Sequence, residues 1–590
     1  MAGKVAEITQ ILQGDTLAKQ LAQLYDTWKI QRSPIEAEWA ELRNYLFATD
    51  TTTTANAALP WKNKTTVPKL TQIRDNLHAN YMDALFPNDD WIRWEGYSED
   101  AVTKDKRRAI EAYIKNKIKE SGFKETISKC VLDYIDYGVA FGDVVWVNET
   151  HKDPVTQEEI TTYIGPKAIR ISPLDIVFNP TAAEFRMSPK FTRYVKTVGE
   201  LKKDVEDYPE FNYMPSAFQK VLDTRSALTN FKREDIDKVN AYYADGFGSL
   251  TEYYQSGYVE LIEFEGDIHD QDTGELLERR IITIADRSIV LRNIENPSWL
   301  GKDSKELVSW RDRPDNLYGM GPLANLVGMQ YRLDHLENLK ADAMDLTVQP
   351  PLVIQGDVDP FEYKPFSQIH IPEDGAVTML APNQGVLAVN NEIAFLLNLM
   401  EEMAGAPKEA MGIRSPGEKT AFEVQQLQNA AGRIFQHKVL KFETFVEKLV
   451  NNMLEVARRN MDVADLTRVL DNDIGVVNFL KITKDDITAK GKLRPVGAKH
   501  YANRAQLMQN LNGVFASPVG QLIAPHISAK RLAQLVEDFM GFEKYDFIQD
   551  NIAIVEQAET QSFAKEVQMQ GAIADQVPAE EGILGLTPQP

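Results

Sequence analysis

The sequence predicts a helix-rich α+β protein built from several structural units. Apolar residues recur at every third or fourth position over long stretches near both ends of the chain, which is the period of amphipathic helices. Between these stretches, residues 258–293 form strand-length runs separated by turn residues, a pattern typical of a β-meander. The chain has 590 residues, 43% of them hydrophobic, so it is long and apolar enough to fill more than one core.

In the first half of the chain, periodicity and turn residues place helices and short strands. Helices are expected within 6–47 on either side of Pro34, and over 69–86, 102–120 and 123–137. Gly138 is a natural C-terminal cap for the last of them. Strands are expected at 141–147, 168–171 and 176–178, and then in the meander of residues 258–293.

The second half of the chain is predicted to be mostly helical. Pro322 suits the first turn of a helix over 319–346, and Pro350 and Pro351 end it. A proline-rich irregular segment and a short apolar helix follow, and then a loop. Thr420 and Glu423 form a capping box that opens a helix reaching about residue 460, the longest in the chain.

The composition excludes several classes of protein. Lys and Arg number 65 against 87 Asp and Glu, a formal charge of −22, which argues against tight binding of nucleic acid over the whole surface. The single cysteine, Cys130, excludes an intramolecular disulfide framework and a cysteine-rich zinc module. No window approaches 18 consecutive apolar residues, so we expect no membrane insertion. The first ten residues also lack the apolar core of a signal peptide.

Motifs that carry catalysis or bind metals and cofactors are missing or incomplete. None of the eight histidines has another histidine three or four positions away, and neither GxSxG nor GxGxxG occurs. Residues 412–420 depart from a phosphate-binding loop because Glu418 precedes Lys419. Residues 267–275 lack the closing glutamate of a calcium loop, and a polar turn between two strands explains them. We therefore expect no catalytic residue, no metal site and no cofactor.

Two basic stretches in this acidic chain are candidates for contact with a phosphate backbone. A solvent-exposed face without a ligand is the alternative for both, and neither has the interleaved aromatic residues of a base-stacking site. The first stretch, 404–419, carries Lys408, Arg414 and Lys419. The second, 481–504, includes Lys490, Lys492, Arg494 and Lys499.

The order of the predicted parts, together with local strings, resembles the portal (head-to-tail connector) proteins of tailed bacteriophages, most closely those of short-tailed phages. No string is diagnostic alone, and the case rests on their order between residues 70 and 460. The strings are Tyr81–Pro87 followed by Trp91–Trp94, Tyr137–Gly142, Ile171–Asp175, Leu317–Pro322 and Thr420–Val424. Beyond residue 460 the resemblance rests on position only.

The resemblance implies a subunit of a twelve-membered ring with the domains of a portal. These are a wing (1–318), a first stem helix (319–346), a clip (347–386), a second stem helix (387–403), a tunnel loop (404–419), a long wing helix with its following segment (420–475) and a crown (476–556). Residues 557–590 match no part of this pattern and are expected to be disordered because they are rich in Gln, Ala, Glu and Pro. The ring would be a conduit through which double-stranded DNA passes without sequence specificity. It would be assembled in the host cytoplasm and would occupy one capsid vertex of the virion.

The resemblance also implies partners, which are the terminase motor, a tail adaptor, and the major capsid and scaffolding proteins. Docking would use the clip, where the candidate residues are Pro350, Pro351, Phe361, Tyr363 and Phe366; packing within the clip is the alternative. The second stem helix is apolar over too wide an arc for an isolated exposed helix. We expect it to pack both against the first stem helix of its own chain and against the neighbouring subunit, with Ile393, Phe395, Leu396 and Leu399 as the interface candidates. Burial inside one domain is the alternative.

Two other classes of function remain open at this point. A DNA-packaging or DNA-processing enzyme would need an intact phosphate loop or a cluster of acidic metal ligands. A head–tail adaptor without a channel would form no large ring. Neither class of enzyme motif is found in the sequence, so the expected function is structural rather than enzymatic.

Overall fold

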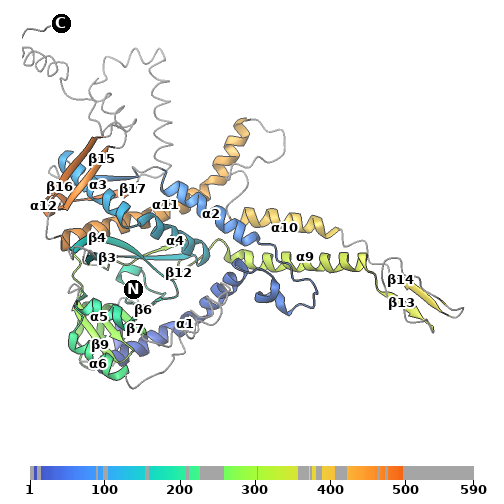
Figure 1. The fold of residues 1–590 in the computed structure, drawn as a ribbon, viewed down its shortest axis with the longest axis horizontal. Helices are drawn as coiled ribbons and strands as arrows, with labels where there is room; N and C mark the ends of the chain where they lie inside the picture. Colours follow the sequence, from blue (N-terminus) through green and yellow to red (C-terminus); the bar gives the residue numbers. More distant parts are fainter. Residues whose placement is uncertain are drawn as a thin grey trace, which may run out of the picture. The chain divides into compact units, whose positions relative to one another are not determined.

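The structure, a computed structural model, is a mixed α+β fold (Figure 1). The chain divides into two units, residues 1–497 and 498–590. It describes residues 5–8, 15–87, 91–97, 104–152, 159–206, 211–225, 258–299, 301, 303–356, 371, 375–379, 388–404, 421–461, 465–471, 476–488 and 490–495. The predicted disordered tail, 557–590, and most of the predicted crown lie outside these residues. No helix among them is long and apolar enough to cross a membrane.

The larger sheet is the predicted meander, and it is covered by helices on both faces. Its strand order is β5-β6-β7-β8-β9, and β1 pairs in parallel with the end of β7. The strands are β1 (Val5–Ile8), β5 (Ile176–Phe178), β6 (Lys190–Thr197), β7 (Tyr258–Asp270), β8 (Leu276–Ala285) and β9 (Ile289–Glu295). Residues adjacent in β7 point to opposite faces: Leu261 packs toward α5 (Val198–Glu206) and α6 (Pro215–Arg225), and Ile262 toward α1 (Asp15–Leu46).

The turn between β7 and β8 lies where the sequence predicts a polar turn. Asp270 accepts hydrogen bonds from the backbone N–H of Asp272 (2.8 Å) and from the hydroxyl of Thr273 (2.7 Å). Gly274 closes the turn with φ of 71°, in the left-handed region that suits glycine. The carboxylate of Asp270 therefore stabilises the turn through local hydrogen bonds, as aspartates in turns commonly do.

The N-terminal region differs from the prediction in two ways. Val5–Ile8 is a strand rather than helix because it pairs with Asp267–Asp270, a partner distant in sequence. The helix α1 then runs without interruption through Pro34. Proline removes the hydrogen bond to the carbonyl of Ile30, but Ile30 is exposed, so water can satisfy that carbonyl. Both ends of α1 are also held by burial, its first half on the meander sheet and its second half in other cores.

The largest core surrounds the long helix α11 (Ala421–Asn460) and confirms the other helices predicted in the N-terminal region. These are α2 (Lys69–Leu85), α3 (Lys104–Glu120) and α4 (Phe123–Asp136). Gly138 follows α4 with φ of 72°, and a Cβ there would lie 2.2 Å from the backbone nitrogen of Gly321. The predicted cap is therefore also a point of close backbone approach, which no larger residue fits.

A three-stranded sheet, order β10-β3-β4, and four two-stranded ladders complete the described fold. Their strands are β2 (Ile92–Gly96), β3 (Val139–Lys152), β4 (Glu159–Ile171), β10 (Glu306–Ser309), β11 (Arg311–Arg313), β12 (Asn316–Met320), β13 (Leu352–Gln355), β14 (Ala376–Met379), β15 (Asp465–Asp471), β16 (Val476–Ile482) and β17 (Gly491–Pro495). Short helical segments are η1 (Thr51–Thr53), η2 (Ala55–Ala58), η4 (Phe185–Met187), η6 (Ala324–Leu326) and α12 (Lys484–Ile487).

The C-terminal boundary lies later than the sequence suggests. We predict a separate unit from residue 476, but β16 pairs with β15, and β17 pairs with β2 near the N-terminus. Residues 476–495 therefore belong to the first compact unit, whose boundary falls at residue 497. These pairings join segments far apart in sequence, and periodicity alone cannot identify such partners.

A buried ion-pair network joins the meander sheet to the segment before β10. The ammonium of Lys305 lies 2.7 Å from Glu263 Oε1 and 3.1 Å from Glu265 Oε2, and Arg292 forms a second pair with Glu263. Burial raises the pKa of Glu265 to about 7, with Lys305 opposing it. For Glu263, Lys305 and Arg292 together outweigh burial and lower the pKa to about 2. The ammonium of Lys305 thus compensates two carboxylates that are largely shielded from solvent.

Candidate functional site

The candidate site is a helical arm formed by α9 (Val327–Val348), the hairpin β13–β14 and α10 (Val389–Met403). The two helices lie side by side, and the hairpin follows the end of α9 (Figure 1). The predicted helix over 319–346 begins only at Val327, because Asn316–Met320 pairs as β12 with β11. The helix predicted over 387–403 is confirmed as α10.

Polar side chains at every fourth position of α9 form hydrogen bonds with the segment 62–67. We call this set the ladder, and its members are Gln330, Asp334, Asn338 and Asp342. At the inner end, Asp334 accepts from the backbone N–H of Val67 (2.9 Å), the hydroxyl of Thr66 (3.0 Å) and the side chain of Gln330 (2.9 Å). Burial raises the pKa of Asp334, although these hydrogen bonds oppose it. A fully buried carboxylate is thus held by donors rather than by a cation.

The ladder continues outward along α9. Asn338 donates to the carbonyl of Thr65 (2.8 Å) and accepts from its N–H (2.7 Å), as an extra strand would. Asp342 accepts from the N–H of Asn63 (3.0 Å) and of Lys62 (3.1 Å). Burial would raise the pKa of Asp342, but these hydrogen bonds hold it below its ordinary value. Segment 62–67 therefore uses the side chains of α9 in place of a β partner.

The aromatic side chain of Trp61 extends the same contact. Its indole N–H donates to Nδ1 of His335 (3.2 Å), and the two rings meet edge to face. Burial and the nearby Arg332 lower the pKa of His335. The neutral imidazole suits this hydrogen bond, since Nδ1 has to accept. The base of α9 is therefore anchored by the segment that follows α1.

The inner side of α10 is anchored within the chain. Ile393, Leu396 and Met400 are buried in the largest core, and Glu401 forms an ion pair with Lys69 at the start of α2. Two of the four residues predicted for a subunit interface are thus already covered by their own chain. Leu399 is half-buried, and Phe395 is 59% exposed, so Phe395 is the member of the set that remains available to a neighbour.

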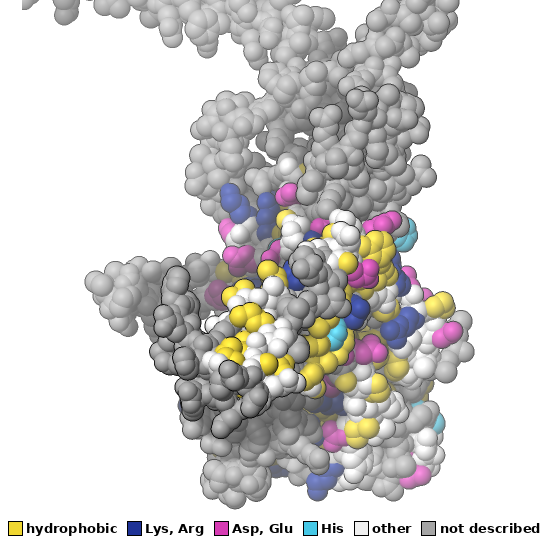
Figure 2. Space-filling model, turned by 90° about the vertical axis from the view of Figure 1, so that its right-hand side faces the viewer, with side chains coloured by type: hydrophobic (Ala, Val, Ile, Leu, Met, Phe, Trp, Pro, Cys, Tyr) yellow, Lys and Arg dark blue, Asp and Glu magenta, His cyan; other side chains and the backbone are white. Residues whose placement is uncertain are grey.

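The outer part of the arm carries an apolar surface that the described chain leaves uncovered. Figure 2, viewed from the side on which the hairpin lies, shows hydrophobic side chains gathered on this face. Val348 at the end of α9 is 81% exposed and Met379 on β14 is 60% exposed. The arm surface consists of Met344, Leu346, Val348, Val353, Ile354, Met379 and Phe395. Exposed apolar side chains concentrated on one part of a protein are typical of interaction surfaces.

The described part of the predicted clip contains a pair of strands. Two short apolar runs that we assign to an irregular segment pair as β13 and β14, with Leu352 opposite Met379. Of the docking candidates, Pro350 is half-buried and Pro351 is exposed at the start of the hairpin. Phe361, Tyr363 and Phe366 lie outside the described residues. The hairpin residues Val353, Ile354 and Met379, absent from the predicted set, are the exposed apolar ones.

The predicted basic residues are only partly placed. Lys408, Arg414 and Lys419 of the tunnel loop lie outside the described residues, as does Lys499. Lys492 pairs with Glu447 of α11 (2.9 Å) and Arg494 with Glu95 of β2 (2.6 Å), whereas Lys490 is exposed. Half of the predicted crown patch is therefore balanced by carboxylates that come from distant parts of the sequence.

No protein-family model matches the chain, and no curated protein matches it. Its function has to be argued from the arm, the charge distribution and the order of the elements.

Proposed function

We propose that this chain is a ring-forming subunit of a portal, the channel through which double-stranded DNA enters and leaves a viral capsid. The observation that carries the proposal is the arm: two helices joined through a hairpin, followed along the chain by a 40-residue helix. This is the order of stem, clip, stem and wing helix that the sequence strings of a short-tailed-phage portal imply. The arm would be the stem and clip of the ring.

The apolar arm surface supports a ring because a closed ring repeats one heterologous interface around an axis. Each arm would bury Phe395 and its exposed neighbours against the next copy. Full burial of one phenylalanine or leucine side chain contributes about 1.5–3 kcal/mol, so several such residues suffice for a stable contact. An arm standing alone in water would leave this surface exposed, which favours association over a monomeric adaptor.

The charge balance supports passage of DNA rather than tight binding. With a formal charge of −22 per chain, a channel of such subunits repels phosphates over most of its wall. Lys408, Arg414 and Lys419 would then make transient, sequence-independent backbone contacts from the loop between the arm and α11. Neutralising all three residues should weaken DNA packaging or retention; unchanged packaging and retention would contradict their role.

Docking of partners is assigned to the hairpin end of the arm. The terminase motor would contact it during packaging, and a tail adaptor afterwards, while capsid and scaffolding proteins would surround the wing in the virion. Pro350 and Pro351 restrict the backbone where the hairpin begins, which lowers the entropy cost of binding. Capture of a tail adaptor by rings that carry Val353→Asp should be weaker than by unchanged rings.

Negative-stain images of the purified protein, paired with an ATPase assay, test the proposed function. Rings with a central hole and no ATP hydrolysis support a conduit. Monomers that hydrolyse ATP would instead indicate a packaging or DNA-processing enzyme. Small oligomers without a hole would indicate an adaptor, and either of these results would contradict the proposal.

A further inference from the structure

The buried ion-pair network around Lys305 belongs to a larger set of charges, which we call the ionic cluster. It extends from β6, β7 and β9 across residues 303–306 to β3 and α11. Among the described residues, its carboxylates are Asp143, Glu263, Glu265, Asp303 and Glu306, and its cations are Arg186, Lys190, Arg292 and Lys305. Five carboxylates therefore meet four cations in a region that is largely shielded from solvent.

Two ion pairs of the ionic cluster are matched one to one. Lys190, whose side chain is fully buried, pairs with Asp303. Arg186 pairs with Glu306, which accepts a further hydrogen bond from the side chain of Asn452 on α11 (3.2 Å). These four charges cancel in pairs, so the unequal count falls on the remaining members.

The remaining three carboxylates share two cations. Arg292 on β9 pairs with Glu263, and Lys305 pairs with both Glu263 and Glu265. Asp143 on β3 accepts its hydrogen bonds from neutral groups, a serine hydroxyl and a backbone N–H. If all three carboxylates were ionised, this centre would carry one uncompensated negative charge. Burying such a charge is costly, and a carboxyl group takes up a proton instead.

Glu265 is the carboxylate that is least prepared for a negative charge. Its Oε2 lies 3.1 Å from the ammonium of Lys305 but receives no hydrogen bond within the described part of the chain. Burial raises the pKa of Glu265 to about 7, although Lys305 opposes the rise, and burial also raises the pKa of Asp143. The charged groups around Glu265 are Glu263 on its own strand, Lys190 opposite it on β6, Asp143 on β3, and Asp303 and Lys305 on the segment before β10.

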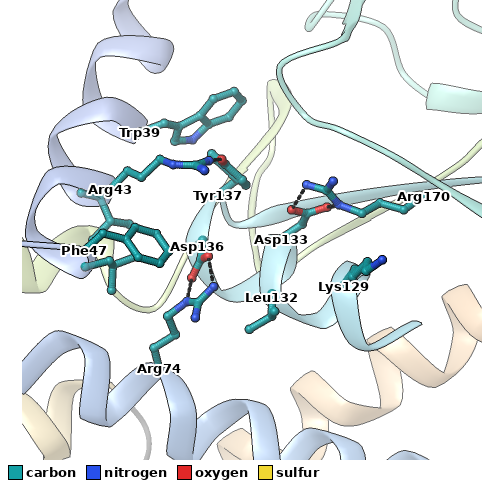
Figure 3. A pocket seen from close by; sticks show the side chains of 12 residues that line it. Trp39, Arg43, Phe47, Arg74, Lys129, Leu132, Asp133, Asp136, Tyr137 and Arg170 are labelled. Atoms are coloured by element: carbon teal, nitrogen blue, oxygen red, sulfur yellow. Dashed lines mark hydrogen bonds and ion pairs between the residues drawn. The ribbon is translucent and has the colours of Figure 1, made fainter. Parts of the chain in front are cut away.

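Two other carboxylates, which line a small cavity between α1, α2, α4 and β4, are paired differently (Figure 3). Arg170 donates two hydrogen bonds to Asp133, and Arg74 donates two to Asp136. Each of these carboxylates thus has an arginine of its own. Glu265 instead shares its cation with Glu263.

We propose that the ionic cluster holds one proton at and below neutral pH, on Glu265, and that releasing this proton to solvent weakens the contact between the meander sheet and residues 303–306. With the proton bound, four cations balance four carboxylates. Without it, one negative charge is uncompensated, and it reaches water only if Lys305 and its segment move away from β7. The cluster is thus a pH-sensitive join between two parts of the fold. The proposal is independent of the function assigned to the arm, since none of these residues belongs to it.

The direction of the pH dependence follows from where the proton is held more tightly. Glu265 binds its proton more tightly when the segment lies against the sheet than when it has moved away, so low pH favours the contact. This preference is lost as pH rises from the ordinary pKa of 4.5 to about 7. The population with the segment detached should therefore rise roughly tenfold between pH 6 and pH 8, with most of the change below pH 7.

Hydrogen exchange of the full chain at pH 6 and pH 8, with each rate divided by the intrinsic rate at that pH, tests the proposal. The peptide that covers residues 303–309 should lose protection roughly tenfold, whereas the peptide of α2 should not. Glu265→Gln has the uncharged shape of the protonated side chain, and Asp143→Asn restores equal numbers of cations and carboxylates. Each should reduce the change to less than about twofold. Glu278→Gln, at an exposed position of β8, is the matched control and should keep it.

Protection of residues 303–309 that does not change with pH in the unchanged chain would overturn the proposal. So would a tenfold change that persists in either Glu265→Gln or Asp143→Asn, once circular dichroism shows that the variant is folded, because neither leaves a proton for the cluster to release. An equal loss of protection in α2 would indicate unfolding of the whole unit rather than movement of the segment, and would also overturn it.

Discussion

The hydrogen-bond ladder on α9 gives the sharpest test of how the arm is held. Replacing Asp334 with alanine removes the acceptor for Val67 N–H, the Thr66 hydroxyl and the Gln330 amide at once. Each buried donor that loses its partner costs about 1–3 kcal/mol. Because Val67 and Thr66 are only part-buried, we expect water to recover some of this, for a total loss of about 3–4 kcal/mol in the free energy of unfolding.

The assay is urea unfolding, combined with hydrogen exchange of the peptide that spans residues 62–67. Asp334→Ala should lower the midpoint and speed exchange of the backbone amide of Val67. Asp345→Ala is the matched control, because Asp345 lies on the same helix and is exposed, and among the described residues its carboxylate accepts a hydrogen bond from Asn63 alone (2.9 Å). It should cost no more than about 1 kcal/mol. Equal losses in the two variants would refute the idea that the ladder anchors α9.

Three other predictions concern the buried ion-pair network around Lys305, the buried carboxyl of Asp133 and the arm. Lys305→Met should cost about 3–5 kcal/mol in urea unfolding because it leaves the buried Glu265 without its ion-pair partner and leaves Glu263 with Arg292 alone. Glu265→Gln, at a carboxyl whose pKa is already raised to about 7, should cost about 1 kcal/mol or less; the reverse order would refute the network. Burial raises the pKa of Asp133 on α4 to about 6, although its ion pair with Arg170 opposes the rise, so Asp133 binds its proton more tightly in the folded state. Stability should therefore fall by about 2–3 kcal/mol as pH rises from 4 to 6, and Asp133→Asn should flatten that part of the profile; an unchanged slope would refute it. Phe395→Asp should lower the oligomer mass measured by light scattering, because it places a charge in the proposed interface. Asn390→Asp adds the same charge at an exposed position of α10 and should leave the mass unchanged. Equal masses for the two variants would argue against an interface at Phe395.

Long periodic helices were predictable because their signal is local. The apolar face of α2 and the stretches of α4 and α11 appear directly in the sequence, and the turn at Asp270 depends on residues that lie next to it. The strand Val5–Ile8 was predicted as helix because its pairing with β7 spans more than 250 positions. Local patterns carry no information about such a partner.

In the arm, too, the sequence shows which side chains are polar but not which segment they contact. Gln330, Asp334, Asn338 and Asp342 recur every fourth residue, so a polar face on α9 was visible in the sequence, but its partner segment was not. Likewise Lys492 and Arg494 suggested a basic patch, until the pairing of β17 with β2 brought Glu95 beside Arg494. Charge counted along the sequence therefore overstates the charge available at a surface.

The proposed function requires that the arms of neighbouring copies contact one another around a channel. A cryo-electron microscopy reconstruction of the purified full chain, 66.7 kDa per copy, tests this directly. It should show a closed ring of twelve copies in which neighbouring arms pack side by side through Phe395 around a central opening. Monomers, or oligomers whose α9 and α10 helices point into solvent without touching a neighbour, would contradict the account.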